Sequence, residues 1–160
     1  RPTNSYTTMV CELLDADFRN LGFAGNALGE ENIADYIANL EMSAFVLDYD
    51  HNAWPERLEQ THERFFKQIR DKNPNLPILI MSRPDFDLNI PESIRRREII
   101  KRTYDNAIAN GDKLVEFIDG ETIFGTVLRD HCTIDNCHPT DLGFDRMTMV
   151  VLPVLKKFLG

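Results

Sequence analysis

Residues 77–86, PILIMSRPDF, contain the most apolar strand candidate of the sequence, and this segment decides the fold class. An apolar run of strand length, bounded by Pro and followed by polar residues, is typical of a buried β-strand. The segment before it begins with Pro55 and repeats apolar residues at helical spacing from Leu58 to Ile69, so a helix is expected there. A buried strand that follows a helix is the unit from which parallel sheets are built.

The same alternation continues along the chain on both sides of this unit. Helices are expected around residues 6–14, 33–40, 100–108 and 147–158, and extended segments at residues 17–25, 43–50 and 113–119. The order is therefore αβαβαβαβα. We predict an α/β fold of the flavodoxin-like, three-layer α/β/α type, in which helices cover both faces of a parallel sheet.

The first predicted element is a helix with no strand before it. A doubly wound sheet would then lack its first strand, which normally lies inside the sheet, and the neighbouring strands would expose unpaired backbone groups. We therefore expect residues 1–160 to be a single domain that is incomplete at its N-terminus.

Composition excludes several classes of function. The chain has 160 residues, of which 42% are hydrophobic and 28% charged, as in ordinary globular proteins. Its formal net charge of −8 disfavours nucleic acid as a partner, and the basic run from Arg95 to Arg102 is expected to be the solvated side of a helix. No apolar run approaches the roughly 20 residues that span a bilayer. A soluble protein is expected, either cytoplasmic or secreted, and its oligomeric state stays open.

Ligands of open parallel sheets bind beyond the carboxyl ends of the strands. Three polar stretches follow predicted strands there: GFAGNA at residues 22–27, LDYDHNAW at residues 47–54 and MSRPDF at residues 81–86. A fourth stretch, TIDNCHPTDLGF at residues 133–144, precedes the last helix. We expect all four to meet at one edge of the sheet.

Asp135 and His138 within the fourth stretch have the residue types of a catalytic base and its orienter. A carboxylate that accepts a hydrogen bond from one imidazole nitrogen fixes the tautomer and leaves the other nitrogen to take a proton from a nucleophile. Spacing alone leaves a second interpretation open, in which Asp135 caps the final helix beside a partly buried histidine.

Three of these stretches together resemble the conserved blocks of the SGNH (GDSL-type) hydrolases. The segment DNCHP before a C-terminal helix resembles the last block, which implies that Asp135 and His138 belong to a Ser-His-Asp triad. NLGFAGNA is similar to the second block and FVLDYDHNAW to the third, which implies oxyanion-hole roles for the Gly25 backbone N–H and the Asn52 side-chain amide. The resemblance implies hydrolysis of a small-molecule ester, such as an acylated carbohydrate, without a cofactor.

The sequence departs from this family at two points. Asp50 and His51 precede Asn52 in place of the usual glycine-containing pattern, and Ala53 follows it. The first block, which carries the nucleophilic serine, has no counterpart in the chain. Ser5, Ser43 and Ser82 lack the exposed turn and the position that a nucleophile needs. The nucleophile is therefore expected upstream of Arg1.

Substrate contacts are expected from Asp50, His51, Trp54 and Arg83, which follow strands on the productive edge. Each also has a structural interpretation. The Asp50 carboxylate could cap a helix or pair with a basic residue. Arg83 could pair with Asp50 or Asp85, and Trp54 could have a packing role alone.

Two other kinds of function stay open at this stage. The first is a zinc-binding protein, since a single segment of the chain offers suitable ligand types. These are His131, Cys132, Asp135, Cys137 and His138. Zinc sites usually add a second, distant pair of ligands, so we expect no metal. The second is a flavodoxin-like module without catalysis, or an inactive remnant of the hydrolase family.

Overall fold

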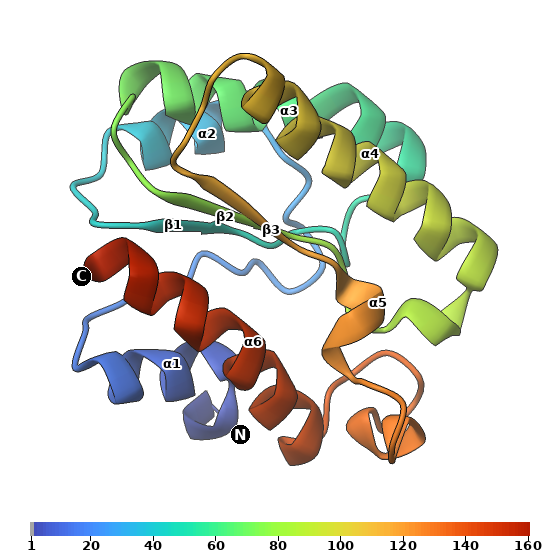
Figure 1. Cartoon of the computed structure of the whole chain (residues 1–160). Helices are drawn as coiled ribbons and strands as arrows, with labels where there is room; N and C mark the ends of the chain where they lie inside the picture. Colours follow the sequence, from blue (N-terminus) through green and yellow to red (C-terminus); the bar gives the residue numbers. More distant parts are fainter. Residues whose placement is uncertain (1) are drawn as a thin grey trace.

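The computed structural model describes residues 2–160, and its centre is a parallel sheet of three strands (Figure 1). The strands lie in the order β1 (Phe45–Leu47), β2 (Ile78–Met81) and β3 (Val115–Ile118). In the register of the sheet, Ile78 of β2 pairs with Phe45 of β1 and with Val115 of β3. All of β2 is buried, because it is the central strand and both of its faces are covered. The strand predicted at residues 77–82 is confirmed.

Helices cover both faces of the sheet (Figure 1). One face carries α2 (Glu31–Ala38), α3 (Pro55–Lys72) and α4 (Ile90–Ala109), and the other carries α1 (Tyr6–Leu14) and α6 (Asp141–Leu159). Short helical turns complete the set: η1 (Pro2–Asn4), η2 (Phe86–Leu88), α5 (Gly120–Ile123) and η3 (Arg129–Cys132). Within residues 2–160, no helix has the length and hydropathy that crossing a bilayer requires.

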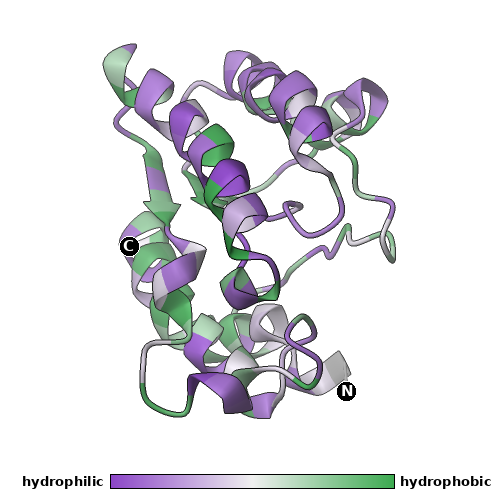
Figure 2. Cartoon of the chain, turned by 90° about the vertical axis from the view of Figure 1, so that its right-hand side faces the viewer, coloured by the Kyte–Doolittle hydropathy of each residue, from purple (hydrophilic) through white to green (hydrophobic). Residues whose placement is uncertain are grey.

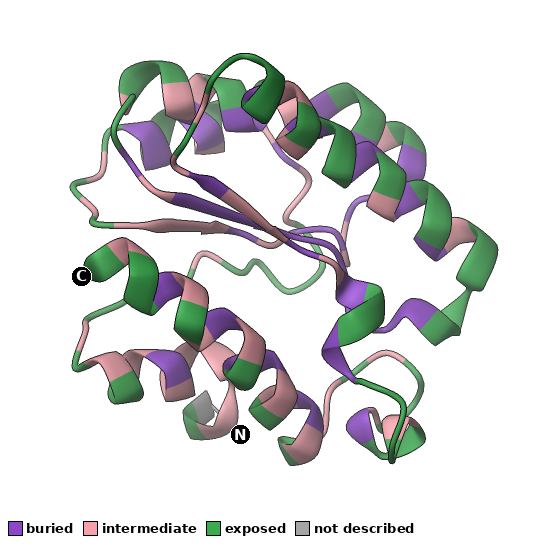
Figure 3. Ribbon diagram, in the orientation of Figure 1, coloured by how far each residue is buried: buried purple, intermediate pink, exposed green. Residues whose placement is uncertain are grey.

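Alternate side chains of β2 divide the core into two halves. Ile78 and Ile80 pack into the cluster beneath α2, α3 and α4, whereas Leu79 and Met81 pack into the cluster beneath α1 and α6. This alternation follows from the two-residue period of a strand. The helices turn buried residues toward the sheet and exposed, hydrophilic residues outward (Figures 2 and 3). The chain is therefore a three-layer α/β/α protein, as predicted.

The prediction of a strand at residues 17–25 is wrong, because this segment is a loop without helix or strand. The Asn20 side chain accepts a hydrogen bond from the Gly22 backbone N–H at 2.8 Å, which makes a local turn. Ala24 and Gly25 then adopt positive φ angles of 48° and 90°, which a strand backbone does not use. Local turn chemistry thus overrides the apolar pattern of this segment.

Candidate active site

The carboxyl ends of the three strands are tied together by hydrogen bonds to backbone N–H groups. After β2, the Ser82 hydroxyl accepts from the Gly120 N–H beyond β3 at 2.8 Å, and the Arg83 N–H donates to Asp50 Oδ2 beyond β1 at 2.8 Å. A Cβ on Gly120 would lie 2.0 Å from the Arg83 carbonyl oxygen, so only glycine allows the two backbones to approach this closely. The strand ends therefore form one rigid edge.

Arg96 of α4 holds the turn that follows β1. Its guanidinium donates to the backbone oxygens of Asp50 and Ala53, and to Asp50 Oδ1 at 3.1 Å. Burial raises the pKa of Asp50, while the Arg83 N–H and the Arg96 cation oppose that shift. These contacts fix the backbone on both sides of Asn52. The expectation that the whole basic run is solvated is wrong for Arg96, which is 5% exposed.

Asn52 and the loop that contains Gly25 lie against each other. The Ala27 backbone N–H donates to Asn52 Oδ1 at 3.1 Å. Since this bond uses the amide oxygen, it fixes the orientation of the amide and leaves its NH2 group as a donor. Gly25 is exposed in the same loop, and a Cβ built on it would meet no atom within 4 Å. The Gly25 backbone N–H and the Asn52 amide therefore belong to adjoining segments, and their joint role as oxyanion donors stays a prediction.

Asp135 and His138 form a hydrogen-bonded pair within a compact loop. Asp135 Oδ2 lies 2.7 Å from His138 Nδ1, and Asp135 Oδ1 accepts from the backbone N–H groups of Cys137 at 3.0 Å and His138 at 2.7 Å. The His138 N–H bonds lower the pKa of Asp135 to about 2, so the carboxylate is ionised at neutral pH. The imidazole is thus oriented by Nδ1 and has Nε2 on its opposite side.

The loop around this pair is anchored at both ends. Thr133 and Pro139 form an isolated antiparallel bridge, and the Thr140 hydroxyl caps α6 by accepting from the Gly143 N–H at 3.3 Å. Thr140, rather than Asp135, is therefore the helix cap. His138 has a side chain that is 77% exposed, so the interpretation of a capping Asp beside a partly buried histidine is wrong.

The family of the chain is shown by its match to a known family model. The model of the GDSL-like lipase/acylhydrolase family matches residues 1–156. The chain belongs to this family. The family resemblance expected from the blocks around Gly25, Asn52 and His138 is confirmed.

Two solved structures share the fold of this GDSL-like chain. One is described as a GDSL-like lipase from Bacteroides ovatus ATCC 8483; it is 29% identical, has a TM-score of 0.86, and the match covers 99% of this chain and 48% of that one. The other is the salicylyl-acyltransferase SsfX3 from a tetracycline biosynthetic pathway, with 18% identity, a TM-score of 0.77, and coverage of 98% and 49%. The chain thus spans about half the length of each. Comparison with curated proteins gives no match.

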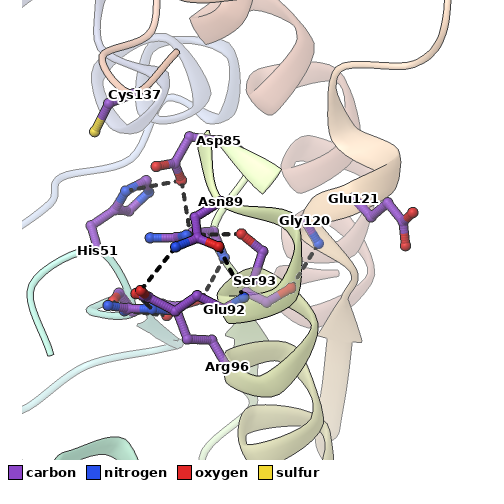
Figure 4. A network of polar contacts seen from close by, with 12 residues as sticks. His51, Asp85, Asn89, Glu92, Ser93, Arg96, Gly120, Glu121 and Cys137 are labelled. Atoms are coloured by element: carbon purple, nitrogen blue, oxygen red, sulfur yellow. Dashed lines mark hydrogen bonds and ion pairs between the residues drawn. The ribbon is translucent and has the colours of Figure 1, made fainter. Parts of the chain in front are cut away.

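Three residues of the GDSL-like chain connect the turn after β1 to the loop of the Asp135–His138 pair (Figure 4). His51 Nδ1 lies 3.3 Å from Asp85 Oδ1, and the Cys137 thiol lies beside the same carboxylate. Because His51 precedes Asn52 and Cys137 precedes His138, this contact brings the third and last blocks of the resemblance together. Asp85 belongs to the stretch PILIMSRPDF, but the sequence suggested it only as a partner of Arg83.

The four residues expected to contact substrate differ in exposure. Asp50 and Arg83 are 1% and 5% exposed, and Arg83 also donates to the Ser93 hydroxyl at 2.8 Å. His51 is partly exposed, and Trp54 is 52% exposed. Their contact with a substrate stays a prediction for all four.

The four serines of the sequence occupy other positions in the fold. Ser5 is the N-cap of α1, and Ser43 precedes β1 at the end of the strand opposite to Asn52. Ser82 and Ser93 are buried, with the hydroxyl groups engaged by Gly120 and Arg83. None of the four is in a hydrogen bond with His138 among the described residues.

Proposed function

We propose that the protein is a carboxylic ester hydrolase of the serine type, in which His138 is the general base and Asp135 its orienter. The observation that carries the proposal is the 2.7 Å contact between His138 Nδ1 and an ionised Asp135, in a chain of the GDSL-like family. A neutral imidazole that donates from Nδ1 has Nε2 as its acceptor, which is the state that a base requires.

The reaction follows from these positions. Nε2 of His138 takes the proton of a serine hydroxyl as the oxygen attacks the ester carbonyl carbon, and Asp135 stabilises the imidazolium. The negative charge on the carbonyl oxygen is bound by the Gly25 N–H and the Asn52 NH2 group. The imidazolium then protonates the leaving alcohol as the C–O bond breaks. Water, deprotonated by the same histidine, attacks the acyl-enzyme carbonyl, and the imidazolium then protonates the serine oxygen as its bond to the acyl carbon breaks and the acid is released.

The nucleophile of this proposal is a serine outside residues 1–160, as the resemblance implies. The positions of Ser5, Ser43, Ser82 and Ser93 support this assignment, since each is engaged elsewhere or lies at the other end of the sheet. The test must therefore use the protein in its full natural length.

The acyl donor we propose is a small ester with polar groups, for example an acylated carbohydrate. Trp54 is the most exposed of the expected contact residues and can stack on an apolar sugar face. Asp50 and Arg83 would act indirectly, because both are buried and hold the turn that carries Asn52.

The decisive variant is His138→Ala, with His131→Ala as its matched control. His131 is an exposed histidine of the neighbouring turn η3 and lies outside the pair. Hydrolysis of 4-nitrophenyl acetate is expected to fall more than about 10⁴-fold in His138→Ala. The control should keep its rate. Labelling by a fluorophosphonate probe, which reacts with activated serines, should be lost in parallel.

Two results would contradict the proposal. Near-normal turnover by His138→Ala would show that His138 is not the base. Absence of both hydrolysis and labelling in the unaltered, folded protein would instead support the non-catalytic module or inactive remnant. Asn52→Ala separates the roles further, since loss of one oxyanion donor is expected to lower the rate by about 10² to 10³ while serine labelling persists.

A further inference from the structure

Three side chains from distant parts of the sequence converge beside the candidate active site (Figure 4). They are His51 from the turn after β1, Asp85 from the loop after β2, and Cys137 from the loop before α6. One imidazole nitrogen, one carboxylate oxygen and one sulfur all lie within 4.8 Å of one another. This group is distinct from the five candidate zinc ligands within residues 131–138, and shares only Cys137 with them.

Asp85 is the unusual member of this group, because its side chain is fully buried and its carboxylate is unsatisfied. The side chain has 0% exposure, and neither oxygen accepts a hydrogen bond from the described residues. The nearest charged donor, Arg83 Nε, is 3.8 Å from Oδ1, which is beyond hydrogen-bond length. A buried carboxylate without such bonds costs several kcal/mol unless a cation or a donor compensates it. Within residues 2–160, the carboxylate therefore accepts no hydrogen bond and has only the longer ionic contacts with Arg83 and His51.

The neighbours of Asp85 are suited to hold a metal ion as the compensating cation. His51 is partly exposed, and its Nδ1 already faces Asp85 Oδ1 at 3.3 Å. Cys137 is half-buried and carries a free thiol. Imidazole, carboxylate and thiolate are the three ligand types that zinc takes in proteins. One Asp and one thiolate also balance the charge of a divalent cation.

We propose that His51, Asp85 and Cys137 form a binding site for a single Zn²⁺ ion. Tetrahedral zinc with bonds of 2.0 to 2.3 Å places its ligand atoms about 3.3 to 3.7 Å apart. The His51–Asp85 distance of 3.3 Å meets this value. No two ligand atoms are more than 4.8 Å apart, so the most distant pair must move closer by about 1 Å to bind one ion. A side chain in the loop at residues 133–139 can make this movement.

Three protein ligands leave the fourth position of a tetrahedral ion to water or to another group. The ion would join the ends of β1 and β2 to the loop before α6. The site depends only on the three ligand side chains, so it holds whether or not Asp135 and His138 catalyse ester hydrolysis.

The test is titration of the untagged, reduced chain with Co²⁺, followed by displacement with Zn²⁺. A thiolate bound to Co²⁺ gives a charge-transfer absorption band, so the spectrum reports directly on Cys137. The matched control is Cys11→Ser, because Cys11 is another half-buried free cysteine, located on α1. The unaltered chain and Cys11→Ser should show the band at one equivalent, and Cys137→Ser should not.

Zinc affinity provides the second readout, measured by competition with a chelating dye. Because loss of even an outer-shell partner of a metal ligand costs about 10- to 100-fold in affinity, His51→Ala and Cys137→Ser should each weaken binding at least tenfold. Asp85→Asn should also weaken binding at least tenfold. If Asp85→Asn fails to fold, His51→Ala and Cys137→Ser still test the site, because their side chains are partly exposed. A thermal shift with Zn²⁺ should occur in the unaltered chain and be lost in Cys137→Ser.

The proposal is overturned if the unaltered chain shows no cobalt band and no zinc affinity. It is also overturned if Cys137→Ser binds as tightly as Cys11→Ser, since the ion would then be held elsewhere. None of these measurements uses ester hydrolysis, so their failure is distinct from failure of the proposed enzymatic function.

Discussion

The buried histidine of α3 should make the stability of the protein depend on pH. His62 is 1% exposed, its Nδ1 lies 2.8 Å from the Thr103 hydroxyl, and its ring stacks on Tyr49 with the ring centroids 5.5 Å apart. Burial lowers the pKa of His62 from 6.5 to about 3, and the charge of Glu63 opposes this only in part. The folded protein therefore keeps the imidazole neutral where the unfolded chain protonates it.

The sign and size of the effect follow from this difference. Between pH 6.5 and pH 3 the unfolded chain binds one proton at residue 62 that the folded chain does not. The free energy of unfolding thus falls as the pH falls through this window, by about 1.4 kcal/mol for each pH unit. From pH 7 to pH 5 the loss due to His62 alone should be about 2 kcal/mol.

The assay is urea unfolding at pH 7 and pH 5, comparing the unaltered chain with His62→Asn. The amide can still reach the Thr103 hydroxyl but does not titrate, so the variant removes the proton and retains a polar partner. Carboxylates titrate equally in both proteins, so they cancel in the comparison. The variant is less stable at pH 7, and its deficit should shrink by about 2 kcal/mol at pH 5. Parallel pH dependences of the two proteins would refute the reasoning.

Three further substitutions test the framework of the site by thermal unfolding. Arg96→Met leaves the Asp50 carboxylate buried without its cation, and should lower the free energy of unfolding by about 3 to 5 kcal/mol. The corresponding fall in Tm is roughly 10 °C. An unchanged Tm would mean that the ion pair makes no net contribution to stability. Gly120→Ala places a Cβ 2.0 Å from the Arg83 carbonyl oxygen and should destabilise by about 1 to 3 kcal/mol, and neutrality would show that the two strand ends can separate. Thr140→Ala removes the cap of α6 and should cost about 1 kcal/mol, with a loss near zero arguing against the cap.

The success of the sequence predictions depends on how local each signal is. The helix α3 and the strand β2 were predicted with nearly their observed bounds, because apolar periodicity and the Pro residues that flank them act over a few residues. The strand prediction at residues 17–25 was wrong because other local signals outweigh the apolar pattern there. These signals are the turn at Asn20 and the positive φ angles at Ala24 and Gly25.

Part of the candidate site was also predictable. Asp135 and His138 are three residues apart in one loop, so their pairing needs only local geometry, and the observed 2.7 Å contact agrees with the sequence interpretation. Arg96 shows the limit of such reasoning. Its neighbours in the sequence, Arg95 and Arg97, are more exposed. Arg96 lies three and four residues before the buried Ile99 and Ile100, so helical spacing indicates its face but not its contact with the distant Asp50.

The amino-acid sequence alone is sufficient for the order of helices and strands after residue 30, for the Asp135–His138 pair and for the family resemblance, because periodicity and motif spacing are properties of short segments. The convergence of His51, Asp85 and Cys137 is a different kind of fact. It depends on how the strand ends and the loop before α6 pack against one another, and three residues that are far apart in the chain carry no joint signal in the sequence. Packing also left the Asp85 carboxylate buried and unsatisfied, and this feature leads to the proposed metal site.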